Sequence, residues 1–284
     1  TRKPTNIEAF LSGEKLQQAE NGTIVYNIFQ NSAVTGNATA EDSLSGIESV
    51  KILKTKSIID WPNASELEDG NEFTISPCTR CFLYVIAKDK AGNTDFIITN
   101  GIVVDDQKPV GKDAGELILK PQSANKNGFF NDDVTVKVSI KDAPDTEDYS
   151  SLKDVDCTIG RSEDEKEGRN LFHATQQSPI ESELKQQKEY ETEVVIDAEK
   201  YESNYAFLDV TAQDYSGNSS TSSQAIKIDI TKPQIRVEFN NNSAQNGSYY
   251  SADRKATIHI SELNFDPEGV EVKATRDGNV YEIA

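Results

Sequence analysis

The sequence predicts an all-β chain of tandem β-sandwich modules in an elongated array, with the last module truncated. Short segments rich in β-forming residues alternate with turn residues along the whole chain. In addition, residues 85–109 and 210–233 follow one pattern: a strand ending in Ala, the turn Asp-x-[Ala/Ser]-Gly-Asn, a second strand, an Asp, and a Pro four residues later. The two copies lie 125 residues apart, from Asp89 to Asp214. A repeat of that period indicates tandem modules.

The prolines after each copy mark the predicted module boundaries. Proline cannot donate to a β-ladder, so Pro109 and Pro233 favour points where the chain leaves one sheet for the next module. We therefore predict modules at residues 1–108, 109–233 and 234–284, the first beginning with a linker over about residues 1–20 that could include a short strand. A sandwich of this kind needs about 100 residues. The third module should therefore be an incomplete sheet docked on the second, and the least stable part of the chain.

Alternation of apolar and polar residues, bounded by turn residues, places the strands of the first two modules. In the first module they are expected at Thr23–Gln30, Val34–Glu41, Ile47–Lys54, 72–76, Phe82–Ala87 and Asp95–Val104. In the second module they are expected at Leu117–Lys120, Val134–Ile140, Val155–Ile159, Tyr190–Ile196, Tyr205–Ala212 and Ala225–Ile230. Ser178-Pro-Ile-Glu181 has the pattern of a helix start, so residues 179–187 are either a short helix or a loop. The acidic stretch 142–167 is expected to be mostly a solvated loop.

The third module repeats the opening of the second. Both contain Pro, a strand, Asn-Gly, two aromatic residues, an Asp, and an alternating strand. This pattern predicts strands at Ile235–Phe239, Lys255–Ile260 and Val270–Ala274. The aromatic pairs at 129–130 and 249–250 occupy equivalent positions, which favours packing against a neighbouring strand over binding of a ligand.

Composition and charge narrow the functional classes. Hydrophobic residues make up 36% of the 284 residues and the net charge is −19. An acidic surface repels phosphate backbones, so nucleic acid is excluded as a partner, whereas cations are attracted. No apolar run approaches the roughly 18 residues of a membrane-spanning helix, and the sequence contains no Met. We interpret it as an internal piece of a longer protein, with no membrane span in this fragment.

Several short motifs resemble those of one family. Asp-Lys-Ala-Gly-Asn at 89–93 and Asp-Tyr-Ser-Gly-Asn at 214–218 resemble the last hairpin of bacterial immunoglobulin-like (Ig-like) repeats. Ser45-Gly-Ile-x-x-Val50 and the run from Asn246 to Ile258, with Asn264-Phe-Asp-Pro267, fit the same pattern. The whole set is similar to tandem Ig-like modules of Gram-positive cell-surface and adhesin proteins. The resemblance implies an extracellular, wall-attached or secreted protein and carries over no catalytic residue.

Acidic and amide residues gather near the module ends. Oxygen ligands from a hairpin turn and an exit strand could bind calcium between modules and stiffen the array. These candidates are Asp89, Asn93, Asp105, Asp106, Asp214, Asn218 and Asp229. Asp and Asn also form ordinary turns by bonding their own backbone, so a purely structural role stays open. No other cofactor is expected.

Cysteine and tryptophan supply two further candidates. Cys78 and Cys81 could form a disulfide if Pro77 introduces a turn, because residues three apart in a strand face opposite sides; two free thiols are the alternative. Trp61, which precedes Pro62, is the one aromatic residue that we expect to be an exposed ligand anchor.

Function follows from the module pattern. We expect no enzymatic activity, because no acid–base pair, nucleophile motif or phosphate loop can be recognised. The leading hypothesis is a structural or adhesive stalk at the bacterial cell surface, monomeric, whose partners are its own neighbouring modules. Two alternatives stay open: a module that itself binds a host glycan or protein, and an accessory region of a secreted carbohydrate-active enzyme. Binding to a glycan array would favour the first alternative, and a catalytic module in the flanking sequence would favour the second.

Overall fold

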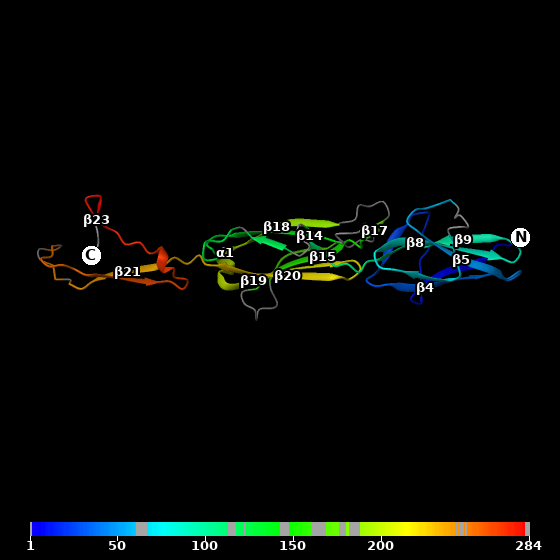
Figure 1. Ribbon diagram of the computed structural model, residues 1–284, viewed down its shortest axis with the longest axis horizontal. Coiled ribbons are helices and arrows are strands. Elements are labelled where there is room, and N and C mark those ends of the chain that lie inside the picture. The colour runs from blue at the N-terminus through cyan, green and yellow to red at the C-terminus, as the bar shows by residue number, and fades with distance from the viewer. Residues whose placement is uncertain are drawn as a thin grey trace.

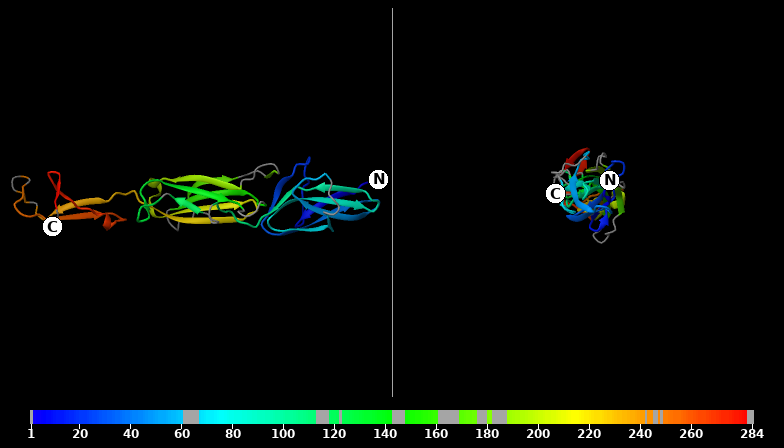
Figure 2. Two further views of the ribbon diagram at one scale, coloured as in Figure 1. Left: turned by 45° about the horizontal axis from the view of Figure 1, so that its top comes forward. Right: turned by 90° about the vertical axis from the view of Figure 1, so that its right-hand side faces the viewer.

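The chain folds as β-modules placed end to end (Figure 1). The computed structural model describes residues 2–60, 67–112, 118–121, 123–142, 148–160, 169–175, 180–181, 188–241, 243–244, 247 and 249–281. In Figure 2 the view along the chain axis superimposes the modules, so the array is about one module wide. The prediction of an all-β fold in tandem sandwiches is confirmed. Among the described residues, no helix is long and apolar enough to cross a membrane.

The first module is a sandwich of two sheets. The smaller sheet has the order β2–β1–β4–β7. Its strands are β1 (Thr5–Leu11), β2 (Glu14–Lys15), β4 (Val34–Glu41) and β7 (Glu72–Ile75). The larger sheet has the order β3–β10–β8–β5–β6, and β9 also pairs with β8. Its strands are β3 (Val25–Gln30), β5 (Ile47–Thr55), β6 (Glu68–Asp69), β8 (Thr79–Asp89), β9 (Thr94–Ile98) and β10 (Gly101–Val104).

Strand β8 organises the core of the first module. Its sequence is apolar on both faces, so it is buried on both sides, as expected for a central strand. Cys81, Leu83 and Val85 face the smaller sheet and join the main core cluster. Phe82 and Tyr84 face the other side, within a second cluster.

The second module is a sandwich of the same kind. One sheet contains β11 (Val110–Gly111), β12 (Ile118–Pro121), β14 (Val134–Lys141) and β18 (Glu189–Ile196). The other has the order β13–β20–β19–β15–β16. Its strands are β13 (Phe129–Phe130), β15 (Leu152–Gly160), β16 (Arg169–Thr175), β19 (Ser203–Asp214) and β20 (Ser219–Ile228). The alternating residues Val134, Val136, Val138 and Ile140 are buried in the core between the sheets, as the pattern predicts. A short helix, α1 (Ala198–Tyr201), connects β18 to β19.

The third module consists of separate β-pairs in the described part of the chain. Strands β21 (Gln234–Phe239) and β22 (Ala256–Ser261) pair with each other, and so do β23 (Ala274–Arg276) and β24 (Asn279–Tyr281). A 3-10 helix, η2 (Pro267–Gly269), lies between the pairs. Because no second sheet of described residues covers β21 and β22, Ile235 and Val237 stay 67% and 50% exposed. This is the incomplete sheet that the sequence predicts.

Four sequence predictions need correction. The linker expected over residues 1–20 is shorter than predicted, because residues 5–11 form the strand β1, in which Ile7, Ala9 and Leu11 alternate inward and are buried. The predicted strand Asp95–Val104 is broken at Thr99–Asn100 into β9 and β10. Ile180–Glu181 is the short strand β17 rather than a helix start; residues 182–187 lie outside the described residues. No strand occupies Val270–Val272, and the neighbouring strand begins at Ala274.

Candidate functional site

The first two modules interlock where the chain passes from one to the other, a region we call the first joint. The ring of Phe29 in the first module stacks on Tyr215 of the second, with centroids 5.0 Å apart. Lys56 Nζ donates to an Asp148 carboxylate oxygen at 2.6 Å. These contacts combine apolar and charged groups from both modules, so the joint resists bending more than a bare linker would.

A strand of the second module also extends the larger sheet of the first. Strand β17 pairs antiparallel with the outer strand β3, with Ile180 opposite Tyr26 and Glu181 opposite Val25. The neighbouring strands of the chain, β16 and β18, belong to the second module. Pairing of β17 therefore covers an edge that would otherwise expose unpaired backbone groups, and it adds a third connection across the joint.

The repeated Asp-x-x-Gly-Asn turn lies at the centre of the joint. The Asp214 carboxylate accepts the backbone N–H of Asn218 at 2.8 Å and its side-chain N–H at 2.7 Å. Gly217 takes φ +88°, which the tight turn requires and which a residue with a side chain rarely adopts. Asn218 Nδ2 also donates to the carbonyl of Asp105, at 2.7 Å. One turn therefore closes a hairpin in its own module and holds the exit segment of the previous one.

Three carboxylates meet in this joint. Asp105 comes from the exit of the first module, Asp142 directly follows β14, and Asp214 begins the turn. Each of the three residues is fully buried, and the group offers carboxylate oxygens that all lie within 4.8 Å of one another. Backbone N–H groups of Gln107 and Ser150 donate to the Asp105 carboxylate at 3.0 and 2.7 Å. The arrangement can hold a cation or share protons.

The pKa values in the two copies of the turn move in opposite directions. Burial raises the pKa of Asp214 to about 7, and the charge of Asp105 acts in the same direction, against the hydrogen bonds from Asn218. Burial also raises the pKa of Asp105. In the first module, Asp89 accepts from Asn93 at the same distances, 2.8 and 2.7 Å, and these bonds lower its pKa. The turn is the same, so the difference arises from the joint around Asp214.

The structure separates the seven predicted cation ligands. Asp105, Asp214 and Asn218 come together at the first joint, together with Asp142. The predicted set did not include Asp142, because it opens an acidic stretch that resembles a solvated loop. Asp89 and Asn93 lie at the other end of the first module, where Asn93 Nδ2 donates to the carbonyl of Arg2. Asp106 is exposed, and the thiol of Cys78 donates to it at 3.6 Å.

Asp229, the seventh predicted ligand, lies at the second joint, between the second and third modules. It accepts a hydrogen bond from Asn264 Nδ2 at 2.6 Å, and Asn264 also bonds Asn204 of the second module. Lys126 pairs with Asp266 at 2.9 Å. These contacts are polar and partly exposed, so they hold the third module less firmly than the stacked first joint holds the second.

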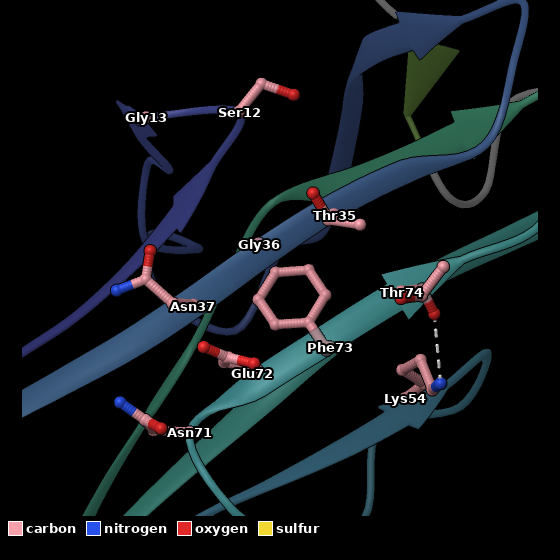
Figure 3. Close-up of a pocket in the computed structure, with 10 residues that line it drawn as sticks. All are labelled: Ser12, Gly13, Thr35, Gly36, Asn37, Lys54, Asn71, Glu72, Phe73 and Thr74. Carbon is pink, nitrogen blue, oxygen red and sulfur yellow. Dashed lines mark hydrogen bonds between the residues drawn. The ribbon is translucent and has the colours of Figure 1, made fainter.

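A polar groove of about 840 Å³ opens on the smaller sheet of the first module (Figure 3). Asn37, Asn71 and Glu72 line it, and Lys54 donates to the carbonyl of Thr74 beside it. The ring of Phe73 packs over Gly36 and is only 4% exposed. An aromatic ring buried in this way offers no free face on which a sugar can stack, so the groove lacks the usual anchor of a glycan site.

The remaining predicted residues do not form a site in the described structure. Cys78 and Cys81 are free thiols in the structure, which is the second of the two alternatives: Cys81 faces the core of the first module, whereas Cys78 faces Asp106 and Gln107. Trp61 lies outside the described residues. Of the aromatic pairs, Phe130 packs on the core of the second module, and the Tyr250 ring lies 3.8 Å from the Arg254 guanidinium.

Comparisons with known proteins give similarities at low identity. The chain is similar to fibronectin(III)-like modules of CbhA from Clostridium thermocellum, with 12% identity over 78% of this chain and 94% of that one, at a TM-score of 0.28. It is similar to a DUF3823 family protein from Bacteroides ovatus, with 12% identity, 81% and 98% coverage, and a TM-score of 0.24. It also matches 29% of the chitinase ChiA74 from Bacillus thuringiensis over 76% of this chain, with 15% identity and a TM-score of 0.21.

At these scores the similarities carry no information on ligands or partners. No protein-family model and no curated protein matches the chain. The β-sandwich architecture of the chain follows from the pairing of its own strands.

Proposed function

We propose that this chain is a non-catalytic spacer in a bacterial cell-surface or secreted protein, which holds a functional segment of that protein at a distance. The observation that carries the proposal is the interlocked end-to-end arrangement of the first two modules (Figure 1). An array of rigid sandwiches with interlocked joints keeps its length under load, which a flexible linker does not. The proposed adhesive role, the Gram-positive origin and the extracellular location rest on the resemblance of the repeated turns to Ig-like surface modules.

Chemistry at the joint supports the same function. Here the polar and aromatic side chains bind other parts of the chain: Asn218 holds the Asp105 carbonyl, and Tyr215 stacks on Phe29. Ser220 Oγ donates to the carbonyl of Pro109 at 2.6 Å. Residues used in this way fix the angle between modules, which is the property that a spacer needs.

Small-angle X-ray scattering tests the proposal. The longest strand has 12 residues, or about 40 Å at roughly 3.3 Å per residue. Two complete modules and the third hairpin in line should therefore span about 100 Å, with a radius of gyration of about 30 Å, whereas a compact body of this length would give about 19 Å. A radius of gyration near the compact value would overturn the proposal. Binding of the isolated chain to a glycan array would instead favour a recognition module.

A further inference from the structure

We propose that the first joint binds a divalent, oxygen-preferring cation, calcium by its size, through the carboxylates of Asp105, Asp142 and Asp214, beside the buried residue Ser151. The inference goes beyond the proposed function, since a cation site at the joint would exist whether the array serves as a spacer or as a binding module. Its basis is the geometry of the joint and one buried hydroxyl group.

The negative charge of the joint favours a bound cation. Three carboxylates, each fully buried, cannot all stay ionised side by side without a compensating positive charge, because their repulsion is poorly screened away from water. A divalent cation offsets two of the three charges. The backbone N–H groups that donate to Asp105 and Asp214 stabilise the charge that remains.

The separation of the carboxylate oxygens fits calcium. Two ligands on opposite sides of an ion are separated by twice the ion–oxygen distance. Oxygens within 4.8 Å of one another are therefore close enough for one ion to contact all three near the roughly 2.3–2.6 Å that calcium prefers. Magnesium needs shorter distances and near-octahedral geometry and keeps several waters, so a closed, carboxylate-rich space fits it less well.

A buried hydroxyl group beside the cluster is a second, independent observation. Ser151 is fully buried, and its hydroxyl has no hydrogen-bond partner among the described residues, which is costly for a buried polar group. It borders the cluster, since its carbonyl accepts from Tyr215 N–H at 3.1 Å and its neighbour Ser150 donates to Asp105. The Ser216 hydroxyl is likewise buried without a partner, in the same turn as Asp214. An ion or its bound water would satisfy such groups.

Comparison between modules shows that Ser151 is not required by the fold. In the first module the corresponding carbonyl is that of Gly46, which accepts from Lys90 N–H at 3.0 Å and has φ +75°. Ser151 adopts φ +77° at the same place, a conformation that is strained for a residue with a side chain. The second module therefore keeps a strained serine, with a buried hydroxyl, where glycine would fold more easily.

The other module supplies a matched control. Asp42 follows β4 as Asp142 follows β14, so the two residues are equivalent by position. Asp42 binds its own loop, accepting from the backbone N–H groups of Leu44, Ser45 and Gly46. Because the Asp42 carboxylate is hydrogen-bonded within its own loop, Asp42→Asn should leave the first joint unchanged.

Calcium titration by calorimetry tests the proposal, with the whole chain stripped by EDTA at pH 7.5. We expect one binding event in the wild-type chain and in Asp42→Asn, and at least a tenfold weaker one in Asp142→Asn. Ser151→Gly, which relieves strain without touching a carboxylate, should raise the melting temperature in EDTA and reduce the rise that calcium gives. This variant keeps the test informative if Asp142→Asn folds poorly.

Two results would overturn the proposal. The first is a folded wild-type chain that shows neither heat nor a rise in melting temperature at millimolar calcium. The second is calcium binding that Asp142→Asn and Asp42→Asn affect equally, which would place the ion elsewhere on the acidic surface. A chain that responds to pH but not to calcium gives the first of these results, because protons alone would then neutralise the cluster.

Discussion

Raising the pH from 5 to 8 in the absence of divalent cations should destabilise the second module. The perturbation acts on Asp214, whose pKa is raised in the folded chain from 3.8 to about 7. A carboxyl group with a raised pKa binds its proton more tightly when folded than when unfolded. Its contribution to stability is therefore fully present below pH 3.8, and it is lost as the pH rises through about 7.

The size of this loss of stability follows from the difference in proton binding between the folded and the unfolded chain. Between pH 5 and pH 7 the unfolded chain has already released this proton and the folded chain still holds it, so stability falls by about 1.4 kcal/mol per pH unit. Two units give a loss of about 3 kcal/mol, and above pH 7 the curve flattens. For a module of this size the loss corresponds to a fall in melting temperature of roughly 10 °C. The charge of Asp105 also acts on Asp214, so the measured midpoint belongs to the two groups together.

Thermal melts of the whole chain in EDTA, followed at several pH values, measure this effect. Asp214→Asn removes the titrating group, so its melting temperature should be lower overall, through one lost hydrogen bond to Asn218, but nearly flat from pH 5 to 8. Asp89→Asn is the matched control: it alters the same turn in the first module, where the pKa is lowered, and should keep the slope. A wild-type melting temperature that is equal at pH 5 and pH 8 would contradict a raised pKa of Asp214, as would an Asp214 carboxyl signal that titrates near 4.

Two further predictions concern the core. Gly36→Ala should lower the free energy of unfolding, measured in urea, by roughly 3 kcal/mol. The new Cβ would lie 2.2 Å from the Phe73 ring and 2.3 Å from the backbone carbonyl of Phe10. A loss below about 0.5 kcal/mol would contradict this packing. Burial raises the pKa of Cys81 to about 11 and of Cys157 to about 12, so native protein at pH 8 should react with a thiol reagent first at the partly exposed Cys78. Intact mass should show three free thiols, and a mass about 2 Da lower would reveal the disulfide that the structure lacks.

Local patterns were sufficient to predict most of the fold. Strands such as β14 can be predicted from the sequence, because alternating Val and Ile residues indicate one face that packs on a core. The position of strand β1 could not be predicted, because its three inward residues, Ile7, Ala9 and Leu11, are separated by a mixture of charged and apolar residues. Strand β17 has only two residues, and it exists because the edge of β3 in another module is available to it. No local sequence pattern contains that information.

The sequence also could not predict which of the acidic residues come together in the candidate site, for a chemical reason. The sequence identified Asp105, Asp214 and Asn218 as residues near a joint, yet it grouped them with Asp89 and Asn93. These two have the same turn, but no second module lies against them among the described residues. Asp142 appeared to belong to a solvated acidic stretch, although it is fully buried. Turn geometry is set within about five residues, whereas the pKa of a carboxylate is set by everything that displaces water from it.

A repeated motif therefore need not have repeated chemistry. In the first module, the Asp-x-x-Gly-Asn turn meets a hydrogen-bonded loop at Asp42 and acts as a simple structural corner. In the second module, the same turn meets the exit Asp of its neighbour, and the corner becomes part of a buried cluster of three carboxylates. What changes between the copies is the module packed against the turn. In an array built this way, the charge state of each joint depends on the pair of modules that form it, so single substitutions at Asp105 or Asp142 should alter a joint without altering either sandwich.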